Sequence, residues 1–417
     1  MKKFLLTIFA CGSLALAHSQ IVTIPNSNFK SYLLNHQDIN TNFDDEIQVA
    51  EALSFTDSII CSGMQINDLT GIEAFENIIF LSCTNNQLTS LDVSHNTALQ
   101  SLICAMNSLS SLDVSSNVYL RNLRCSMNPI YSLNISNNPD LEYLYCESNN
   151  LSSLDVSQNP DLIELYCTNN SIQTLNLIPH TSLIELDCSS NPLNQLDFAP
   201  IMALQYIMCN GSQLPSITLT SCPNLVTFRG VGGTYTELNL YNCPNLERFD
   251  CPFTQLTSLD FSENPQLKVV YCFSSQLTSL NIANGHNDEL ELLWVSNNQL
   301  NCIKVDNAAY SEANWTGNDF AFDPGVSFDE NCVAALNHLE KPTLELYPNP
   351  ATTTINIETP EKMSYKLIST DGSTIATGEF PAGNNSFSTE SLPVGVYFFD
   401  CVGSTTGRIV QKFQKTE

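Results

Sequence analysis

A cysteine every 21 residues is the feature of this sequence that most restricts its fold. The uninterrupted part of the series is Cys83, Cys104, Cys125, Cys146, Cys167, Cys188 and Cys209. The register begins with Cys61, continues through Gly230, Cys251 and Cys272, and reaches Val295 after a two-residue insertion. A fixed period of this length predicts a repeat array in which each unit stacks only on its neighbours. The register gives about twelve coils.

Each coil repeats one pattern of apolar and polar residues. In one coil Leu99, Leu102 and Cys104 alternate with other residues, which predicts a short strand with one buried face. An asparagine follows at the bend, where its side chain can bond backbone groups that a tight turn leaves unpaired. This place is taken by Asn86, Asn107, Asn128, Asn149, Asn170, Asn191 and Asn298. The period leaves no room for an α-helix on the back of the coil, so we expect extended or 3₁₀ backbone there.

This pattern resembles the leucine-rich repeat family, with cysteine in the third apolar place of the strand. The resemblance covers about residues 53–301. It implies a mainly β fold, a leucine-rich repeat solenoid whose parallel sheet lies on the concave face.

The cysteine column does not have the geometry of a disulfide series or a metal site. In-register parallel strands hold neighbouring Cβ atoms about 4.8 Å apart, whereas a disulfide needs about 3.8 Å and converging bonds. Zinc needs four ligands that converge on one point, and a line of thiols does not converge. We therefore interpret the cysteines as small, buried and reduced side chains.

The N-terminal segment predicts export followed by a cap. Residues 1–17 carry two lysines, an apolar run and a small-residue ending, the pattern of a secretory signal peptide. Residues 18–52 predict an N-terminal helical cap, because Phe29, Tyr32 and Leu33 share one helical face.

A polar loop inside this cap matches the spacing of an EF-hand-like calcium loop. Positions 1, 3, 5, 7, 9 and 12 of that loop fall on Asn40, Asn42, Asp44, Glu46, Gln48 and Glu51. The match is degenerate, because position 1 is not Asp and Asp45 stands where the loop needs a left-handed glycine. Two interpretations stay open, a Ca²⁺ site and a polar capping turn. Calcium is the candidate cofactor.

After residue 301 the repeat register ends. Residues 302–335 resemble the C-terminal caps of bacterial leucine-rich repeat proteins, and Cys302 and Cys332 flank this segment. The resemblance implies a disulfide between Cys302 and Cys332 that closes a loop of about thirty residues. The alternative is two more buried thiols.

Residues 344–417 predict a separate small β-sandwich of short alternating strands, with a turn at Asp371-Gly372. The unit resembles the type A C-terminal sorting domain of the type IX secretion system. The residues that carry the resemblance are Tyr347-Pro348-Asn349-Pro350-Ala351, Ile355, Ile357, Gly395-Val396-Tyr397-Phe398, Arg408, Lys412 and Lys415. The resemblance implies a secreted or outer cell-surface location in a Gram-negative bacterium, with the type IX secretion machinery as a partner of residues 344–417.

Charge and motifs argue against several classes of function. A formal net charge of -28 disfavours nucleic acid and anionic lipid as partners. No stretch after the signal peptide is long and apolar enough to predict a transmembrane segment. The histidines are scattered and no metalloprotease or nucleophile motif occurs. Glu142, Glu164 and Glu185 form a solvated ladder in this register, not an enclosed acid–base pocket, so we expect no enzyme.

The residue just before each column cysteine differs strongly from coil to coil, whereas the cysteine position itself is nearly constant. Variation of this kind is typical of a recognition surface, although unconstrained exposed positions would also give it. The basic residues between positions 31 and 303 all fall in concave strand positions by register, and they are Arg121, Arg124, Arg229, Arg248 and Lys268. Several aromatic residues join them, and Tyr, Trp and Arg are enriched at binding hot spots. Acidic residues on the same face can pair with the arginines as ordinary cross-strand neighbours.

These observations predict a non-catalytic secreted or cell-surface binding protein. Its concave face would recognise a protein or a glycan. The expected binding residues are Arg124, Tyr145, Tyr166, Arg229, Tyr271 and Trp294. The alternative is a structural or matrix spacer without a specific ligand.

Overall fold

The computed structural model describes residues 20–177, 180–196, 198, 201–219, 222–332, 344–369, 373–403 and 407–416. The expected signal peptide, residues 1–17, lies outside the described residues. The chain divides into two units, residues 1–141 and 142–417, and each is described by itself.

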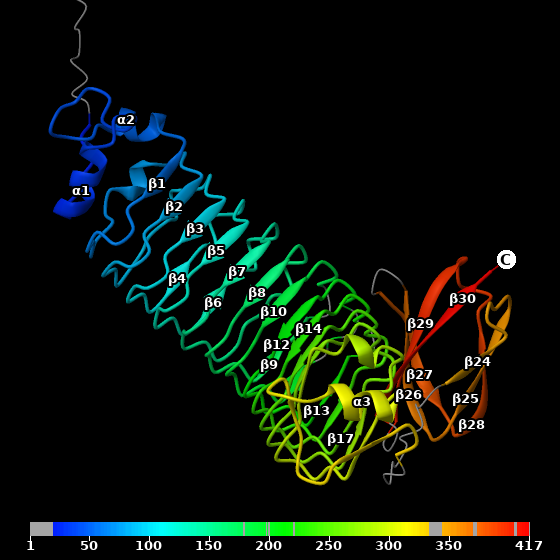
Figure 1. The fold of residues 1–417 in the computed structure, drawn as a ribbon. Coiled ribbons are helices and arrows are strands. Elements are labelled where there is room, and N and C mark those ends of the chain that lie inside the picture. Colours follow the sequence, from blue (N-terminus) through cyan, green and yellow to red (C-terminus); the bar gives the residue numbers. More distant parts are fainter. Residues whose placement is uncertain are drawn as a thin grey trace, which may run out of the picture. The chain divides into compact units, whose positions relative to one another are not determined.

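The first unit begins with two short helices, α1 (Ser27–Leu34) and α2 (Val49–Ser54). The Asn26 side chain caps α1 by accepting a hydrogen bond from Phe29 N, and α1 buries Phe29 and Leu33. In-register parallel strands follow, β1 (Ser58–Ile60), β2 (Phe80–Ser82), β3 (Ser101–Ile103) and β5 (Asn122–Arg124). The backs of these coils carry a 3₁₀ turn, η1 (Ile72–Ala74), and the paired strands β4 (Leu112–Asp113) and β6 (Leu133–Asn134) (Figure 1).

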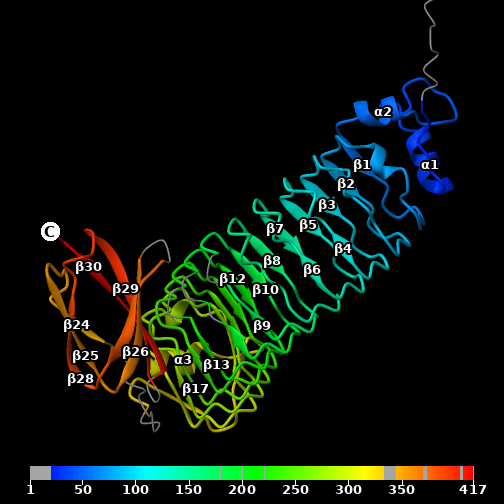
Figure 2. The same cartoon turned by 180° about the vertical axis from the view of Figure 1, so that it is seen from behind.

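The second unit continues the same coil design. Its parallel strands are β7 (Tyr143–Tyr145), β8 (Glu164–Tyr166), β10 (Glu185–Asp187), β12 (Tyr206–Met208), β14 (Thr227–Arg229), β16 (Arg248–Asp250), β18 (Val269–Tyr271), β20 (Leu292–Trp294) and β22 (Phe320–Ala321). Its back strands are β9 (Thr174–Leu175), β11 (Gln195–Leu196), β13 (Ser216–Thr218), β15 (Glu237–Asn239), β17 (Ser258–Asp260), β19 (Ser279–Asn281), β21 (Cys302–Lys304) and β23 (Ser327–Asp329). A 3₁₀ turn, η2 (Asn287–Glu289), and a helix, α3 (Ala308–Asn314), complete it (Figure 2).

The predicted mainly β solenoid with a parallel sheet is confirmed, with thirteen strands in its main sheet. The expected extended or 3₁₀ back is also confirmed. The thirteenth strand, β22, comes from the segment after residue 301, which the repeat register did not include.

The core of each coil is built from leucines and a thiol. Leu144, Leu165 and Leu186 are fully buried at the middle of their strands. The column cysteines are buried and free, as expected of small apolar side chains. Burial raises the pKa of the Cys61 and Cys209 thiols to about 12. They are therefore protonated at neutral pH, which makes them poor nucleophiles.

The bend asparagines bond the backbone across coils, as predicted. Asn107 Nδ2 donates to Cys83 O and Cys104 O at 3.0 Å each, and its Oδ1 accepts from Leu88 N at 3.0 Å. One coil thus satisfies backbone groups of the coil before it.

A second buried asparagine column lies ten residues later in the coil. Asn117 Nδ2 donates to Val93 O at 3.0 Å and to Asn96 O at 2.9 Å. His180 takes this place in its own coil and is 1% exposed. Its ring nitrogens make no hydrogen bond of good geometry, and burial lowers the pKa of His180 against the opposing effect of the nearby Asn159 and Val156 backbone.

Gly230 interrupts the cysteine column because another side chain fills its place. A Cβ on Gly230 would lie 2.1 Å from the Tyr235 hydroxyl oxygen. Tyr235 is fully buried, and its hydroxyl donates to Gly230 O and to Cys251 Sγ. The tyrosine hydroxyl therefore occupies the space that a thiol fills in neighbouring coils.

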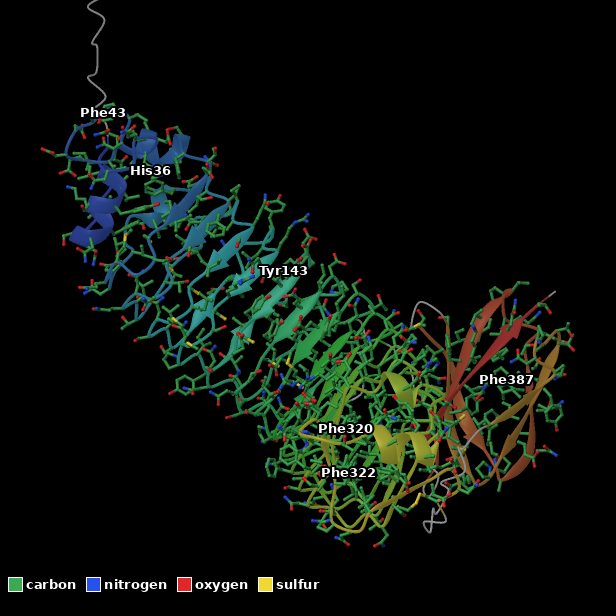
Figure 3. All side chains as sticks on the ribbon, viewed as in Figure 1. His36, Phe43, Tyr143, Phe320, Phe322 and Phe387 are labelled. Carbon is green, nitrogen blue, oxygen red and sulfur yellow. A yellow bond between two sulfur atoms is a disulfide. The ribbon has the colours of Figure 1, made fainter. Side chains whose placement is uncertain are left out.

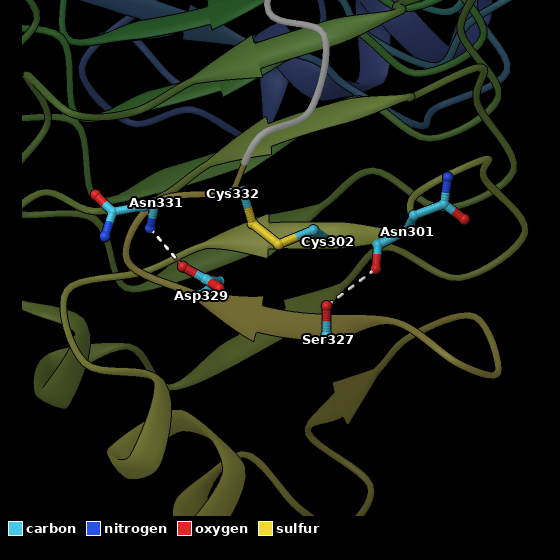
Figure 4. Close-up of a disulfide and its surroundings, with 6 residues drawn as sticks. All are labelled: Asn301, Cys302, Ser327, Asp329, Asn331 and Cys332. Carbon is cyan, nitrogen blue, oxygen red and sulfur yellow. Dashed lines mark hydrogen bonds between the residues drawn. A yellow bond between two sulfur atoms is a disulfide. The ribbon is translucent and has the colours of Figure 1, made fainter.

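The predicted disulfide between Cys302 and Cys332 is confirmed (Figure 4). It joins the start of β21 to the segment after β23, with a Cα–Cα distance of 5.9 Å. Nearby, Asn331 N donates to Asp329 Oδ1 at 2.7 Å, and Ser327 Oγ donates to Asn301 O at 3.3 Å. The bond fixes this end of the last coils covalently.

The C-terminal residues form two small antiparallel sheets. One contains β24 (Glu345–Tyr347), β25 (Thr354–Thr359) and β28 (Gly383–Ser388), in the order β24-β25-β28. The other contains β26 (Met363–Ser369), β27 (Thr374–Phe380), β29 (Gly395–Gly403) and β30 (Gly407–Lys415), in the order β27-β26-β29-β30. Their shared core includes Ile355, Ile357, Phe399, Cys401 and Phe413. The predicted turn at Asp371-Gly372 lies outside the described residues, between β26 and β27.

Candidate functional site

The surface of interest is the side of the parallel sheet to which the first and last residues of each strand point, opposite the buried middle residue. We call it the open sheet face and define it by the outer residues of β7, β8, β10, β12, β14, β16, β18 and β20. In most of these strands the middle residue is buried and its two neighbours are partly exposed. Figure 3 labels Tyr143, an outer residue of β7, among these side chains. This is the surface that was expected to be concave.

Five of the six expected binding residues lie on this face. They are Tyr145, Tyr166, Arg229, Tyr271 and Trp294, each at the end of its strand. Arg124 occupies the same place on β5 in the first unit, where its Nε donates to Asn122 Oδ1 at 3.2 Å.

Two tyrosines and two glutamates form the first cluster on the open sheet face. The Tyr145 and Tyr166 rings stack with centroids 4.7 Å apart and planes 12° apart. Tyr145 donates a hydrogen bond from its hydroxyl to Glu164 Oε2. Burial and a hydrogen bond with Glu185 raise the pKa of Tyr166. The cluster therefore presents two stacked phenol rings beside two glutamate side chains.

Two arginines share one aspartate in the second cluster. Arg229 Nε and Arg248 Nε each lie 2.9 Å from Asp250 Oδ2. The Asp250 side chain is 5% exposed, whereas the arginine side chains are 46% and 39% exposed. The aspartate thus orients both guanidinium groups and leaves them in contact with solvent.

An aromatic group adjoins the arginines. The Arg248 guanidinium lies 5.2 Å from the centre of the Tyr271 ring, which packs edge-on against Trp294 at 5.4 Å. Phe273 contacts Trp294 at 6.4 Å and Phe253 at 5.1 Å. Trp294 Nε1 donates to Asn318 O at 3.1 Å. These contacts join the residues into one mixed cationic and aromatic patch.

The structure corrects two details of the expected face. Arg121 and Lys268 lie one residue before β5 and β18, not within the strands. Glu164 is paired in register with Tyr143 and Glu185, so Glu142 is not part of the carboxylate ladder. In both cases a one-residue shift separates the observed place from the expected one, and such a shift changes the face to which a side chain belongs.

Phe253 is a residue of this patch that sequence reasoning missed. It stands two places after Cys251, in a column of left-handed residues, with φ 59°. Ser190 and Ser274 hold the same place in their coils. An aromatic residue in a column otherwise filled by small, amide or methionine side chains was the available signal. Phe253 is 58% exposed.

The polar residues of the expected calcium loop lie between α1 and α2, except Glu51, which is in the first turn of α2. Glu51 and Asn40 are buried, whereas Asn42 and Asp44 are exposed. Glu46 forms an ion pair with Lys30 at 2.7 Å. Within the described ranges, no three His, Cys, Asp or Glu side chains are grouped so as to hold a metal ion. A metal ion in this loop would therefore need amide side-chain oxygens and main-chain carbonyl oxygens as ligands, in addition to carboxylates.

The structure also bears on membrane association. Across the described residues, none of the helices has the length and apolar character needed to span a bilayer.

Comparisons with known proteins match both parts of the chain. Residues 345–416 match the family described as the secretion system C-terminal sorting domain. An internalin (inlF) from Listeria monocytogenes is similar with a TM-score of 0.60 and 19% identity, over 75% of this chain and 94% of that one. A leucine-rich repeat protein of Leptospira interrogans is similar with a TM-score of 0.56 and 18% identity, over 67% of this chain and 75% of that one. At these identities the likeness shows the fold alone.

A search of curated protein sequences found no match. The sorting-domain match and the fold agree with the resemblances carried by the repeat and by the C-terminal motifs. The chain therefore combines a solenoid with the leucine-rich repeat fold and, at residues 345–416, a match to the secretion system C-terminal sorting domain.

Proposed function

We propose that this protein is a non-catalytic binder that recognises a protein or a glycan through the open sheet face. Type IX secretion, directed by residues 344–417, delivers it outside the cell or to the outer surface. The observation that carries the proposal is the pre-set patch of Arg229, Arg248, Tyr271 and Trp294.

The chemistry of this patch favours binding over mere exposure. Tyr, Trp and Arg give large contact areas with directional polar groups. Because Asp250 and the neighbouring rings already hold these side chains, a ligand loses little free energy in ordering them.

The arrangement offers little to catalysis. Glu164 and Glu185 lie side by side on adjacent strands of an open sheet, and Tyr145 already donates to Glu164. General acid–base catalysis needs a substrate proton within reach of a group held apart from bulk water. We therefore place the function of this face in recognition.

The test compares two sets of alanine substitutions in the full-length protein. The first set replaces the six expected binding residues: Tyr145, Tyr166, Arg229, Tyr271 and Trp294 of the open sheet face, and Arg124, which holds the same strand place in the first unit. The matched control replaces Tyr119 and Tyr131, aromatic residues outside the strands that are 60% and 64% exposed. Glycan arrays and capture of extracellular proteins identify a ligand, and titration measures its affinity.

We expect the six-residue variant to bind at least about 100-fold more weakly, since each hot-spot residue typically contributes 1 kcal/mol or more. The control should bind as the wild type does. Equal binding by the six-residue variant would show that the face is wrong. If the wild type binds no glycan or protein specifically, the spacer interpretation is the better one.

A further inference from the structure

We propose that the loop from Asn40 to Glu51 binds one calcium ion and thereby stiffens the N-terminal cap of the solenoid. This inference does not depend on the open sheet face. It rests on the side chains of the loop and on a buried oxygen that has no hydrogen-bond partner.

Glu51, at the twelfth position, closes the loop. It lies on α2 and is 8% exposed. Its Oε1 accepts from Thr41 N at 2.8 Å and from Asn42 N at 3.2 Å, and its Oε2 accepts from Gln48 N at 3.0 Å. The last carboxylate therefore reaches back across the start of the loop, which is where the closing glutamate of an EF-hand binds its ion.

Asn40, at the first position, supplies the observation that points to a ligand. It is 4% exposed, and its Nδ2 donates to Leu34 O at 3.1 Å and to Asp44 O at 2.9 Å. Its Oδ1 is buried and has no hydrogen-bond partner. The amide nitrogen thus connects the end of α1 to a carbonyl in the middle of the loop, and the carboxamide lies between the two. A buried acceptor left unpaired costs about 1–3 kcal/mol, and a cation would satisfy it.

Asp44 brings the third, fifth and ninth positions together. Its Oδ2 accepts from Asn42 Nδ2 and from Gln48 Nε2, each at 2.9 Å. Asn42 Nδ2 also donates to Gln48 Oε1 at 2.7 Å, so the two amide groups and the carboxylate form one cluster. Rotation of either amide by half a turn presents its oxygen in place of its nitrogen, because the two ends have nearly the same shape. The same side chains can therefore surround a cation with oxygens.

Glu46, at the seventh position, fits the same scheme. Its carboxylate lies 2.7 Å from Lys30 Nζ and is engaged in that ion pair. The seventh position of an EF-hand contributes its main-chain carbonyl and not its side chain, so this pairing leaves the expected ligand free.

The main chain after this position is held by the N-terminal segment. Val22 N donates to Ile47 O at 2.8 Å, Val49 N donates to Gln20 O at 2.7 Å, and Ile47 is fully buried. An ion in the loop would consequently connect the first described residues to α2. The left-handed turn residue is Phe43, with φ 60°, and not Asp45 as the sequence suggested. Phe43 points outward at the tip of the loop (Figure 3).

The oxygen ligands of the loop favour calcium over other ions, and their total charge predicts how tightly it binds. All candidate ligands are oxygens, which suit a hard cation that accepts irregular coordination. Only Asp44 and Glu51 contribute charge, and few charged ligands give weak sites with a Kd of about 0.1–1 mM. Extracellular calcium modules work in this range, and this chain is exported.

The experiment titrates calcium chloride into the full-length protein in an isothermal calorimeter and follows thermal unfolding in parallel. The test variant is Asp44→Asn, and the matched control is Asp45→Asn. The control removes the same charge from the next residue, at a position that supplies no ligand. Both side chains are exposed, so both variants should fold. Limited proteolysis of the loop with and without calcium gives a readout that does not need a thermal transition.

We expect the wild type to bind one calcium ion with the stated Kd, to unfold about 2–4 °C higher at about 10 mM calcium, and to resist cleavage in the loop. Asp44→Asn should weaken binding about 10-fold or more, and Asp45→Asn should change it about 2-fold or less. No heat, shift or protection in the wild type would overturn the proposal in favour of a capping turn. Equal weakening in both variants, or an equal response to magnesium, would overturn it in favour of diffuse charge attraction.

Discussion

Tyr235 and Gly230 should be energetically coupled, because one fills the space that the other leaves. In Gly230→Cys the new Cβ would lie 2.1 Å from the tyrosine hydroxyl oxygen and 3.0 Å from Phe228 Cε1. Overpacking of a core costs about 1–3 kcal/mol. Displacement of the hydroxyl from Gly230 O and Cys251 Sγ adds about 1 kcal/mol. We expect the single change to lower the free energy of unfolding by about 3 kcal/mol.

Tyr235→Leu alone should cost a similar amount for the opposite reason. It removes a fully buried ring and leaves a cavity beside Gly230, at about 2–3 kcal/mol. The double variant Gly230→Cys with Tyr235→Leu recreates the pair found in other coils, such as Cys209 with Leu214. The thiol then fills the space of the hydroxyl, so we expect a total loss of about 3 kcal/mol where simple addition gives about 6.

Urea unfolding measures these values, with the fluorescence of Trp294 and Trp315 as the signal for this part of the solenoid. The four proteins form a double-mutant cycle, and the expected coupling is about 2–3 kcal/mol. Additive effects of the two substitutions would refute the idea that Tyr235 substitutes for the missing cysteine. Equal m-values across the cycle would show that the unfolding reaction itself is unchanged.

Two further predictions concern stability. In another coil Asn117 holds the place of His180, and both N–H groups of its amide donate to backbone carbonyls. His180→Asn should restore these two hydrogen bonds, so we expect the free energy of unfolding to rise by about 1 kcal/mol at pH 7. Burial lowers the pKa of His180 from 6.5, so the unfolded chain takes up a proton that the folded chain resists, and wild-type stability falls as the pH drops below 6.5. The advantage of the variant should therefore grow in urea unfolding at about pH 5, and a gain that is the same at both pH values would contradict this. Replacing Cys302 and Cys332 by serine should lower the free energy of unfolding by about 3–4 kcal/mol under non-reducing conditions, since the bond closes a loop of 30 residues. Reducing agent should lower the wild type toward the variant, and a wild type insensitive to reduction would argue against this role.

The repeat made most of the solenoid predictable from sequence. A period of 21 residues repeats the same backbone hydrogen bonds, so one coil predicts the next, and the asparagine bonds of Asn107 recur at Asn128. The buried thiols follow from the same register. The disulfide followed from the resemblance of residues 302–335 to known caps.

The exceptions to the repeat were harder to predict, because each depends on a partner elsewhere in the coil or in the next one. Gly230 was visible as a gap in the column, but only the structure shows that Tyr235 fills it. The strand β22 carries no cysteine and no register signal, and it is set by pairing with β20. The left-handed residue at Phe43 likewise depends on how the loop closes, not on local preference.

Charge is distributed unevenly over the open sheet face, with negative side chains on some strands and positive ones on others. Glu164, Glu185 and Asp187 place three carboxylates on the adjacent strands β8 and β10. Arg229 and Arg248 share the single carboxylate of Asp250, so β14 and β16 carry one uncompensated positive charge beside the Tyr271 and Trp294 rings. A ligand that lies across successive strands of this sheet therefore meets an acidic region at β8 and β10 and a cationic region at β14 and β16. Electrostatic complementarity of this kind fixes orientation and rejects wrong partners more than it adds affinity. We expect the ligand to have a matching asymmetry, basic at one end and acidic or aromatic at the other.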